Sequence, residues 1–242
     1  MIGYRHASTR HSEKGADAMR RRDFIQIAAA WPARELSGAA ACLPREGTSR
    51  HRQHSLLHSH GEFEQFQYVG SRNQPNVYAI DGSFYFSVMQ RRGSAGPDNP
   101  SVYQITRKGQ LRVVTRECTQ PNGVALAPNQ QKLFVADTVQ RNVRVFEVNG
   151  DGSLGNGRIF CELKGETPGG PDGLKTDEAG NVWVAGPGGI WVFDGSGKHL
   201  GTVPLPETPS NCAWGAGFRN LYVTAGTSVY RIETKVNGTR TY

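Results

Sequence analysis

The chain has 242 residues, of which 30 are glycine and 37% are hydrophobic, a composition typical of one turn-rich β domain. Its net charge of +7 comes mainly from the first 60 residues, which hold 10 basic and 5 acidic residues, whereas the remainder holds 18 and 16. Because a nucleic-acid groove would need its basic charge on the folded part, we expect no nucleic-acid binding. The sequence contains no run of 18 apolar residues, so we expect no membrane span.

The N-terminal segment differs in composition from the rest of the chain. Residues 1–65 lack sustained apolar periodicity, so we expect a poorly ordered, signal-like or unrelated segment ahead of a domain at 66–242. Within it, Arg20–Ile25 resembles a twin-arginine export signal, although Pro32 and Glu35 interrupt the apolar part. A functional signal would place the protein in the periplasm; otherwise we expect the cytoplasm.

Beyond residue 72 the sequence changes to short β-prone runs separated by turn residues. The runs 76–80 and 83–88 flank Asp81-Gly82, a pair that favours a two-residue hairpin turn. The runs 102–105 and 111–114 flank a second turn at Lys108-Gly109. Together they predict four strands within about 40 residues, the usual span of one propeller blade.

The same four-strand unit recurs along the chain. The second and third copies are predicted at 124–126, 133–136, 143–148 and 158–160, and at 173–176, 182–185, 190–193 and 199–203. A fourth copy, at 211–214, 221–224 and 229–232, lacks an obvious last strand. Aromatic residues of successive third strands, Tyr103, Phe146, Phe193 and Tyr230, are separated by 43, 47 and 37 residues. A repeat of this length predicts an all-β propeller with about four recognisable blades.

Polar residues stand at the start of successive first strands. Asn122, Asp172 and Asn211 occupy equivalent places in three blades, and first strands line the central channel of a propeller. Their side chains offer oxygen atoms, which hard cations such as calcium prefer. The alternative is that Asn or Asp before Gly only forms a turn.

Cysteine spacing gives no sign of a second kind of metal site. The four cysteines, Cys42, Cys118, Cys161 and Cys212, lie far apart, and no C-x-x-C pair occurs. This pattern favours buried free thiols over a zinc ribbon or a redox motif.

Several motifs in the second half of the chain resemble the SMP-30/gluconolactonase family. They are Pro121-Asn122-Gly123-Val124-Ala125-Leu126, Leu133-Phe134-Val135-Ala136-Asp137-Thr138, Pro171-Asp172-Gly173-Leu174-Lys175 and Gly189-Ile190-Trp191-Val192-Phe193. The resemblance implies a six-bladed β-propeller that binds one divalent cation, calcium first and zinc second, and hydrolyses a sugar lactone. It also implies that Asn122 and Asp172 bind the cation and that Asp172 acts on the attacking water, with Asn76 and Asn211 as candidate substrate contacts.

The sequence also departs from the family pattern. The family's further metal-binding Glu lies in a segment like G-E-G-P-x-W, which this chain lacks, since Glu62 and Glu64 stand in a different context. Two alternatives to a lactonase therefore stay open: a propeller that binds without catalysing, and a truncated, inactive member. In each case we expect a monomer.

Overall fold

The computed structural model describes residues 76–89, 100–215 and 217–240, together with the backbone of three short strands nearer the N-terminus. Those strands are β1 (Ile25–Ile27), β2 (His54–Leu57) and β3 (Phe63–Phe66). The rest of residues 1–65, including most of the signal-like stretch, lies outside the described residues, so its separation from the domain stays a prediction. The described part is all β and contains no helix that is long and apolar enough to cross a membrane.

Four antiparallel sheets of four strands each make up the described fold, and a two-stranded sheet, β2-β3, accompanies them. The first sheet consists of β4 (Asn76–Tyr78), β5 (Phe84–Val88), β6 (Ser101–Ile105) and β7 (Leu111–Thr115). The second consists of β8 (Pro121–Leu126), β9 (Lys132–Asp137), β10 (Asn142–Glu147) and β11 (Arg158–Glu162). The third consists of β12 (Leu174–Thr176), β13 (Val182–Gly186), β14 (Gly189–Phe193) and β15 (His199–Pro204). All three sheets confirm the predicted blades.

The fourth sheet takes one strand from the other end of the chain. Its order is β1, β18 (Ser228–Thr234), β17 (Asn220–Ala225) and β16 (Pro209–Trp214), and β1 runs antiparallel to β18 with Ile25 opposite Thr234. The strand that the fourth repeat lacks is therefore supplied by Ile25–Ile27, at the end of the twin-arginine-like stretch. This pairing joins the N-terminal segment to the last blade, in the way propellers close.

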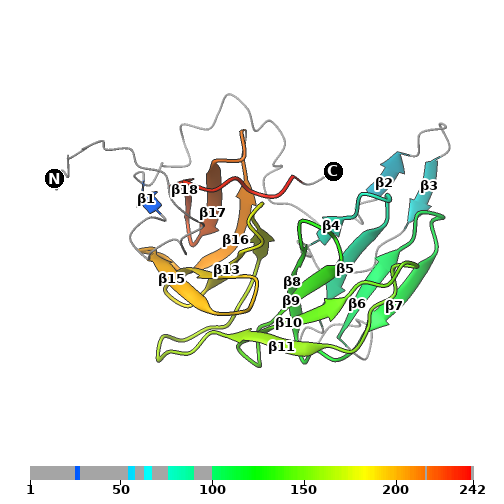
Figure 1. Cartoon of the computed structure of the whole chain (residues 1–242), viewed down its shortest axis with the longest axis horizontal. Helices are drawn as coiled ribbons and strands as arrows, with labels where there is room; N and C mark the ends of the chain where they lie inside the picture. The colour runs from blue at the N-terminus through cyan, green and yellow to red at the C-terminus, as the bar shows by residue number, and fades with distance from the viewer. Residues whose placement is uncertain are drawn as a thin grey trace, which may run out of the picture.

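The blades lie side by side in chain order along an arc (Figure 1). The first strand of each blade is its inner strand: β4 and β5 pack against β8, β8 against β12, and β12 against β16. Apolar side chains fill each interface between blades, among them Leu133, Leu174 and Leu221, which are fully buried. Burial between neighbours stabilises each blade, because a single blade has no core of its own.

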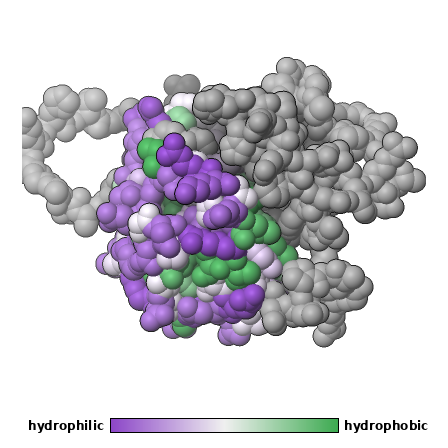
Figure 2. All heavy atoms as spheres, turned by 90° about the vertical axis from the view of Figure 1, so that its right-hand side faces the viewer, coloured by the Kyte–Doolittle hydropathy of each residue, from purple (hydrophilic) through white to green (hydrophobic). Residues whose placement is uncertain are grey.

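Aromatic side chains cover the face of the first sheet that points away from the second. Phe86 stacks on Tyr103 with 5.4 Å between ring centroids, and Phe84 packs between Phe86 and Tyr78. Figure 2 views the side of the molecule that carries β6 and β7 and shows an apolar band between hydrophilic areas. Phe86 is only 8% exposed, so it is buried within this aromatic cluster.

Candidate functional site

The inner strands all begin at the same end of the propeller axis, which we call the upper mouth. Asn76 is the first residue of β4, Asn122 the second residue of β8, and Asn211 lies near the start of β16. Asp172 lies two residues before the start of β12, with Gly173 between them. The turns that follow align Asn122 with Asp172 in adjacent blades, whereas Asn76 aligns with Val124. Asn211 lies one residue beyond Ser210, whose carbonyl accepts from Gly173 as the Asp172 carbonyl accepts from Gly123.

Two glycines let neighbouring inner strands approach closely at this mouth. The Gly123 N–H donates to the Asp172 carbonyl at 3.1 Å, and the Gly173 N–H donates to the Ser210 carbonyl at 3.0 Å. A Cβ on Gly123 would lie 2.2 Å from the Asp172 carbonyl oxygen, and a Cβ on Gly173 would lie 2.0 Å from Asn211 Oδ1. The glycines of the repeated motif therefore allow close contact between blades. Asn122-Gly123 lies within β8, so the alternative that this pair only forms a turn is wrong.

Asn122 and Asp172 meet at the upper mouth. Asn122 is only 7% exposed, and Asp172 is partly buried. Burial raises the pKa of the Asp172 carboxyl from 3.8 to about 6, while hydrogen bonds from the Asn122 side chain and the Gly173 backbone oppose that rise. Because the carboxylate is partly desolvated and has few donors, it is suited to accept a cation or a proton.

The other two predicted residues contribute differently. Asn211 is exposed, and its Oδ1 accepts a hydrogen bond of 2.8 Å from the Cys212 backbone N–H while lying against Gly173. Asn76 is also exposed and lies opposite Phe86 in the register of β4 and β5. Asn211 therefore lies beside the residue that follows Asp172, and the role of both amides as substrate contacts stays a prediction.

Sequence reasoning missed two hydroxyl groups behind Asn122. Ser87 Oγ donates to the Asn122 carbonyl oxygen at 2.6 Å, and Thr138 Oγ1 lies 3.2 Å from Asn122 Nδ2. Thr138 belongs to the Leu133–Thr138 motif quoted above, but serine and threonine at the end of a strand carry no distinctive signal on their own. The Ser87 contact joins two blades, so it is visible only in the folded structure.

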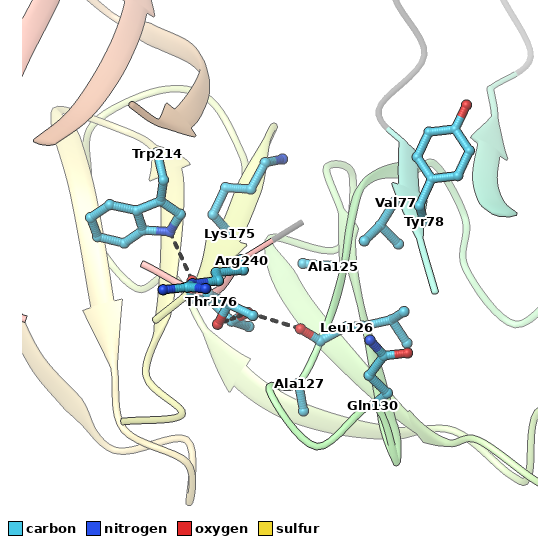
Figure 3. A pocket seen from close by; sticks show the side chains of 11 residues that line it. Val77, Tyr78, Ala125, Leu126, Ala127, Gln130, Lys175, Thr176, Trp214 and Arg240 are labelled. Atoms are coloured by element: carbon cyan, nitrogen blue, oxygen red, sulfur yellow. Dashed lines mark hydrogen bonds between the residues drawn. The ribbon is translucent and has the colours of Figure 1, made fainter. Parts of the chain in front are cut away.

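The lower ends of the inner strands are closed. Thr176 Oγ1 donates to the Leu126 carbonyl, and Trp214 Nε1 donates to the Thr176 carbonyl, both at 2.8 Å (Figure 3). The cavity between them, bordered also by Lys175 and Arg240, has a volume of about 20 Å³. A space that holds about one water molecule cannot admit a sugar ring.

The donor set of the site consists of oxygen atoms. Within the residues that the structure describes, no group of three or more His, Cys, Asp or Glu side chains could hold a metal ion. Cys118, Cys161 and Cys212 are buried free thiols, as predicted, and burial raises their pKa values to between about 11 and about 12. Glu62 lies outside the described residues, and for Glu64 only the backbone, in β3, is described.

The fold and the upper mouth together define a β-propeller with an amide and carboxylate site at the start of its inner strands. A model of the SMP-30/Gluconolactonase/LRE-like region matches residues 14–227. The chain belongs to this family, and the match includes much of the segment ahead of the first described blade.

Relatives with established names agree with this assignment. The chain is 28% identical over 190 residues to a gluconolactonase of Zymomonas mobilis, covering 71% of this chain and 53% of that protein. It is 30% identical over 128 residues to the pentonolactonase XacC of Haloferax volcanii, covering 51% of this chain and 44% of that protein. A solved gluconolactonase of Xanthomonas campestris superposes with a TM-score of 0.62 at 26% identity, covering 74% and 64% of the two chains. The chain thus spans about half the length of the curated relatives it matches.

Proposed function

We propose that this protein hydrolyses a sugar lactone to the corresponding hydroxy acid at the upper mouth, with one divalent cation held by Asn122 and Asp172. The observation that carries the proposal is the meeting of the Asn122 amide with the partly buried Asp172 carboxylate. The names gluconolactonase, pentonolactonase and L-arabinolactonase among the relatives support the choice of substrate class.

The residues present fit a hard cation. Asn122 Oδ1 and the Asp172 carboxylate are oxygen donors from adjacent blades, and calcium prefers such donors to thiolate or imidazole. Calcium is therefore our first choice and zinc the second. When bound, the cation would polarise the lactone carbonyl.

The chain's own groups account for the remaining steps. The Asp172 carboxylate can accept a proton from the attacking water. The water oxygen bonds to the lactone carbonyl carbon, the ring C–O bond breaks, and the ring oxygen takes up a proton to become the hydroxyl of the product. We assign to the exposed amides of Asn76 and Asn211 the hydrogen bonds to the sugar hydroxyls.

Removal of the cation should abolish activity. We expect the purified full chain to accelerate acid release from glucono-δ-lactone, measured by pH-stat above the spontaneous rate. EDTA and Asp172→Ala should each reduce that acceleration at least about 100-fold, and calcium should restore the EDTA-treated enzyme.

A matched control removes a carboxylate at the other end of the blade. Glu147 is exposed at the end of β10, and Glu147→Gln should retain wild-type activity. Lactone hydrolysis that survives both EDTA and Asp172→Ala would refute the proposal. A folded chain that binds no divalent cation and hydrolyses no lactone would instead favour a propeller that binds without catalysing.

A further inference from the structure

One hydroxyl group joins the two residues of the proposed cation site from outside it. Thr138 follows β9 directly, and its Oγ1 donates a hydrogen bond of 2.8 Å to the Pro171 carbonyl oxygen. The same Oγ1 lies 3.2 Å from Asn122 Nδ2. It therefore contacts Asn122 in its own blade and the residue before Asp172 in the next blade.

The single proton of this hydroxyl decides which way the Asn122 amide points. A carbonyl oxygen can only accept, so the Thr138 proton must be directed at Pro171. Toward Asn122 the hydroxyl can then only accept, and it must face the NH₂ group of the amide. The second N–H of that group is directed at the Asp172 carboxylate, which accepts a hydrogen bond from the Asn122 side chain. Oδ1 is left as the atom of Asn122 that can bind a cation.

Other contacts hold the segment ahead of Asp172 in place. A Cβ on Gly170 would lie 2.1 Å from the Thr138 carbonyl oxygen, so Gly170 allows the two loops to touch. The Asp172 N–H donates to the Ala185 carbonyl at 2.8 Å, and Ser87 Oγ holds the Asn122 carbonyl at 2.6 Å. Both backbones are therefore fixed, and the amide orientation of Asn122 is the degree of freedom that Thr138 removes.

We propose that Thr138 is a positioning residue, whose hydroxyl orients Asn122 Oδ1 toward the cation and sets the spacing between Asn122 and Asp172. This inference rests on the proposed function, because it assigns an orienting group to the same site. Groups that orient metal ligands typically change affinity 10- to 100-fold when they are removed. Thr138 itself touches neither the cation nor the substrate.

Two substitutions separate the hydroxyl from the rest of the side chain. Thr138→Val keeps the shape and removes the hydrogen bonds, whereas Thr138→Ser keeps the hydroxyl and removes a methyl group. Calcium binding to the EDTA-stripped full chain is measured by calorimetric titration, well below the melting temperature. Relative to wild type, the Kd should rise about 10- to 100-fold for Thr138→Val and less than about threefold for Thr138→Ser. Thr202→Val removes an exposed hydroxyl on β15 and should leave the Kd unchanged.

Activity measured against calcium concentration gives a second readout. Thr138→Val should need about 10- to 100-fold more calcium for half-maximal hydrolysis and approach the wild-type rate at saturation. A wild-type Kd in folded Thr138→Val, with an active wild type, would overturn this inference and leave the proposed function standing. A wild type that binds neither calcium nor zinc would overturn both. If Thr138→Val does not melt cooperatively, Thr138→Ala is used in its place. Failure of both variants to fold would show that the hydroxyl is structural and would overturn the inference.

Discussion

Asp172→Asn is expected to lower lactone hydrolysis about 10²- to 10⁴-fold and, in the metal-free protein at pH 8, to raise the melting temperature. The first effect follows from losing the group that we assign to the attacking water. The second follows from burial, which raises the pKa of this carboxyl to about 6 and so disfavours its charged form. Asparagine keeps an oxygen that can accept the hydrogen bond from Asn122 and removes the charge.

The pH dependence of the stability difference has a definite sign. An aspartate with a pKa of 3.8 when unfolded and about 6 when folded binds more protons in the folded state between these values. Wild-type stability therefore falls as pH rises from about 4 to about 6 and is then constant as far as this group is concerned. Asp172→Asn should therefore be more stable than the wild type at pH 8, and this difference in stability should disappear below pH 4.

Thermal melts in EDTA at pH 4, 6 and 8, for wild type and Asp172→Asn, measure this difference. We expect a rise on the order of 2 °C at pH 8. Added calcium should stabilise the wild type and not the variant, since only the wild type has the charged ligand. A variant that is less stable than the wild type in EDTA at pH 8 would contradict the assignment of Asp172 as a desolvated charge.

Turn chemistry made much of the fold predictable. In the predicted Asp81-Gly82 hairpin, Gly82 has a φ of 84°, and Asp81 Oδ1 accepts hydrogen bonds from the Ser83 backbone and side chain. Ser153 makes the same two bonds to Asp151, at another turn of the repeat. Such signals are local, and they mark the ends of strands within a blade. The number and order of strands in three blades followed from them.

Contacts between distant segments were not predictable in this way. The strand β1 has only three residues, too few for any periodicity, and its partner β18 lies about 200 residues further along the chain. Thr138 likewise gains its role from Pro171, in another blade. The positions of Asn122 and Asp172 could be predicted because the repeat aligns them, whereas the residues that hold them are specific to one interface and leave no repeated pattern.

Gly123→Ala is expected to destabilise the protein strongly, because the blades already touch at this point of the upper mouth. The added Cβ would lie 2.2 Å from the Asp172 carbonyl oxygen and 2.9 Å from the Leu174 nitrogen, both backbone atoms that cannot rotate away. Gly123 does not have a left-handed backbone, so the cost is steric. Separating β8 from β12 should cost about 3 kcal/mol and break the hydrogen bond from Gly123 to Asp172.

Gly150→Ala is the matched control, because no heavy atom lies within 4 Å of the added Cβ and the backbone conformation is an ordinary one. Urea unfolding should give a free energy within about 0.5 kcal/mol of wild type for Gly150→Ala. Gly123→Ala should lower the urea midpoint. Without urea, where the variant is folded, it should also bind calcium more weakly, because moving the Asp172 backbone separates the two oxygen donors. A Gly123→Ala protein with a wild-type midpoint would mean that the blades can part without cost. The glycine of the repeated motif would then not be what brings Asn122 and Asp172 together.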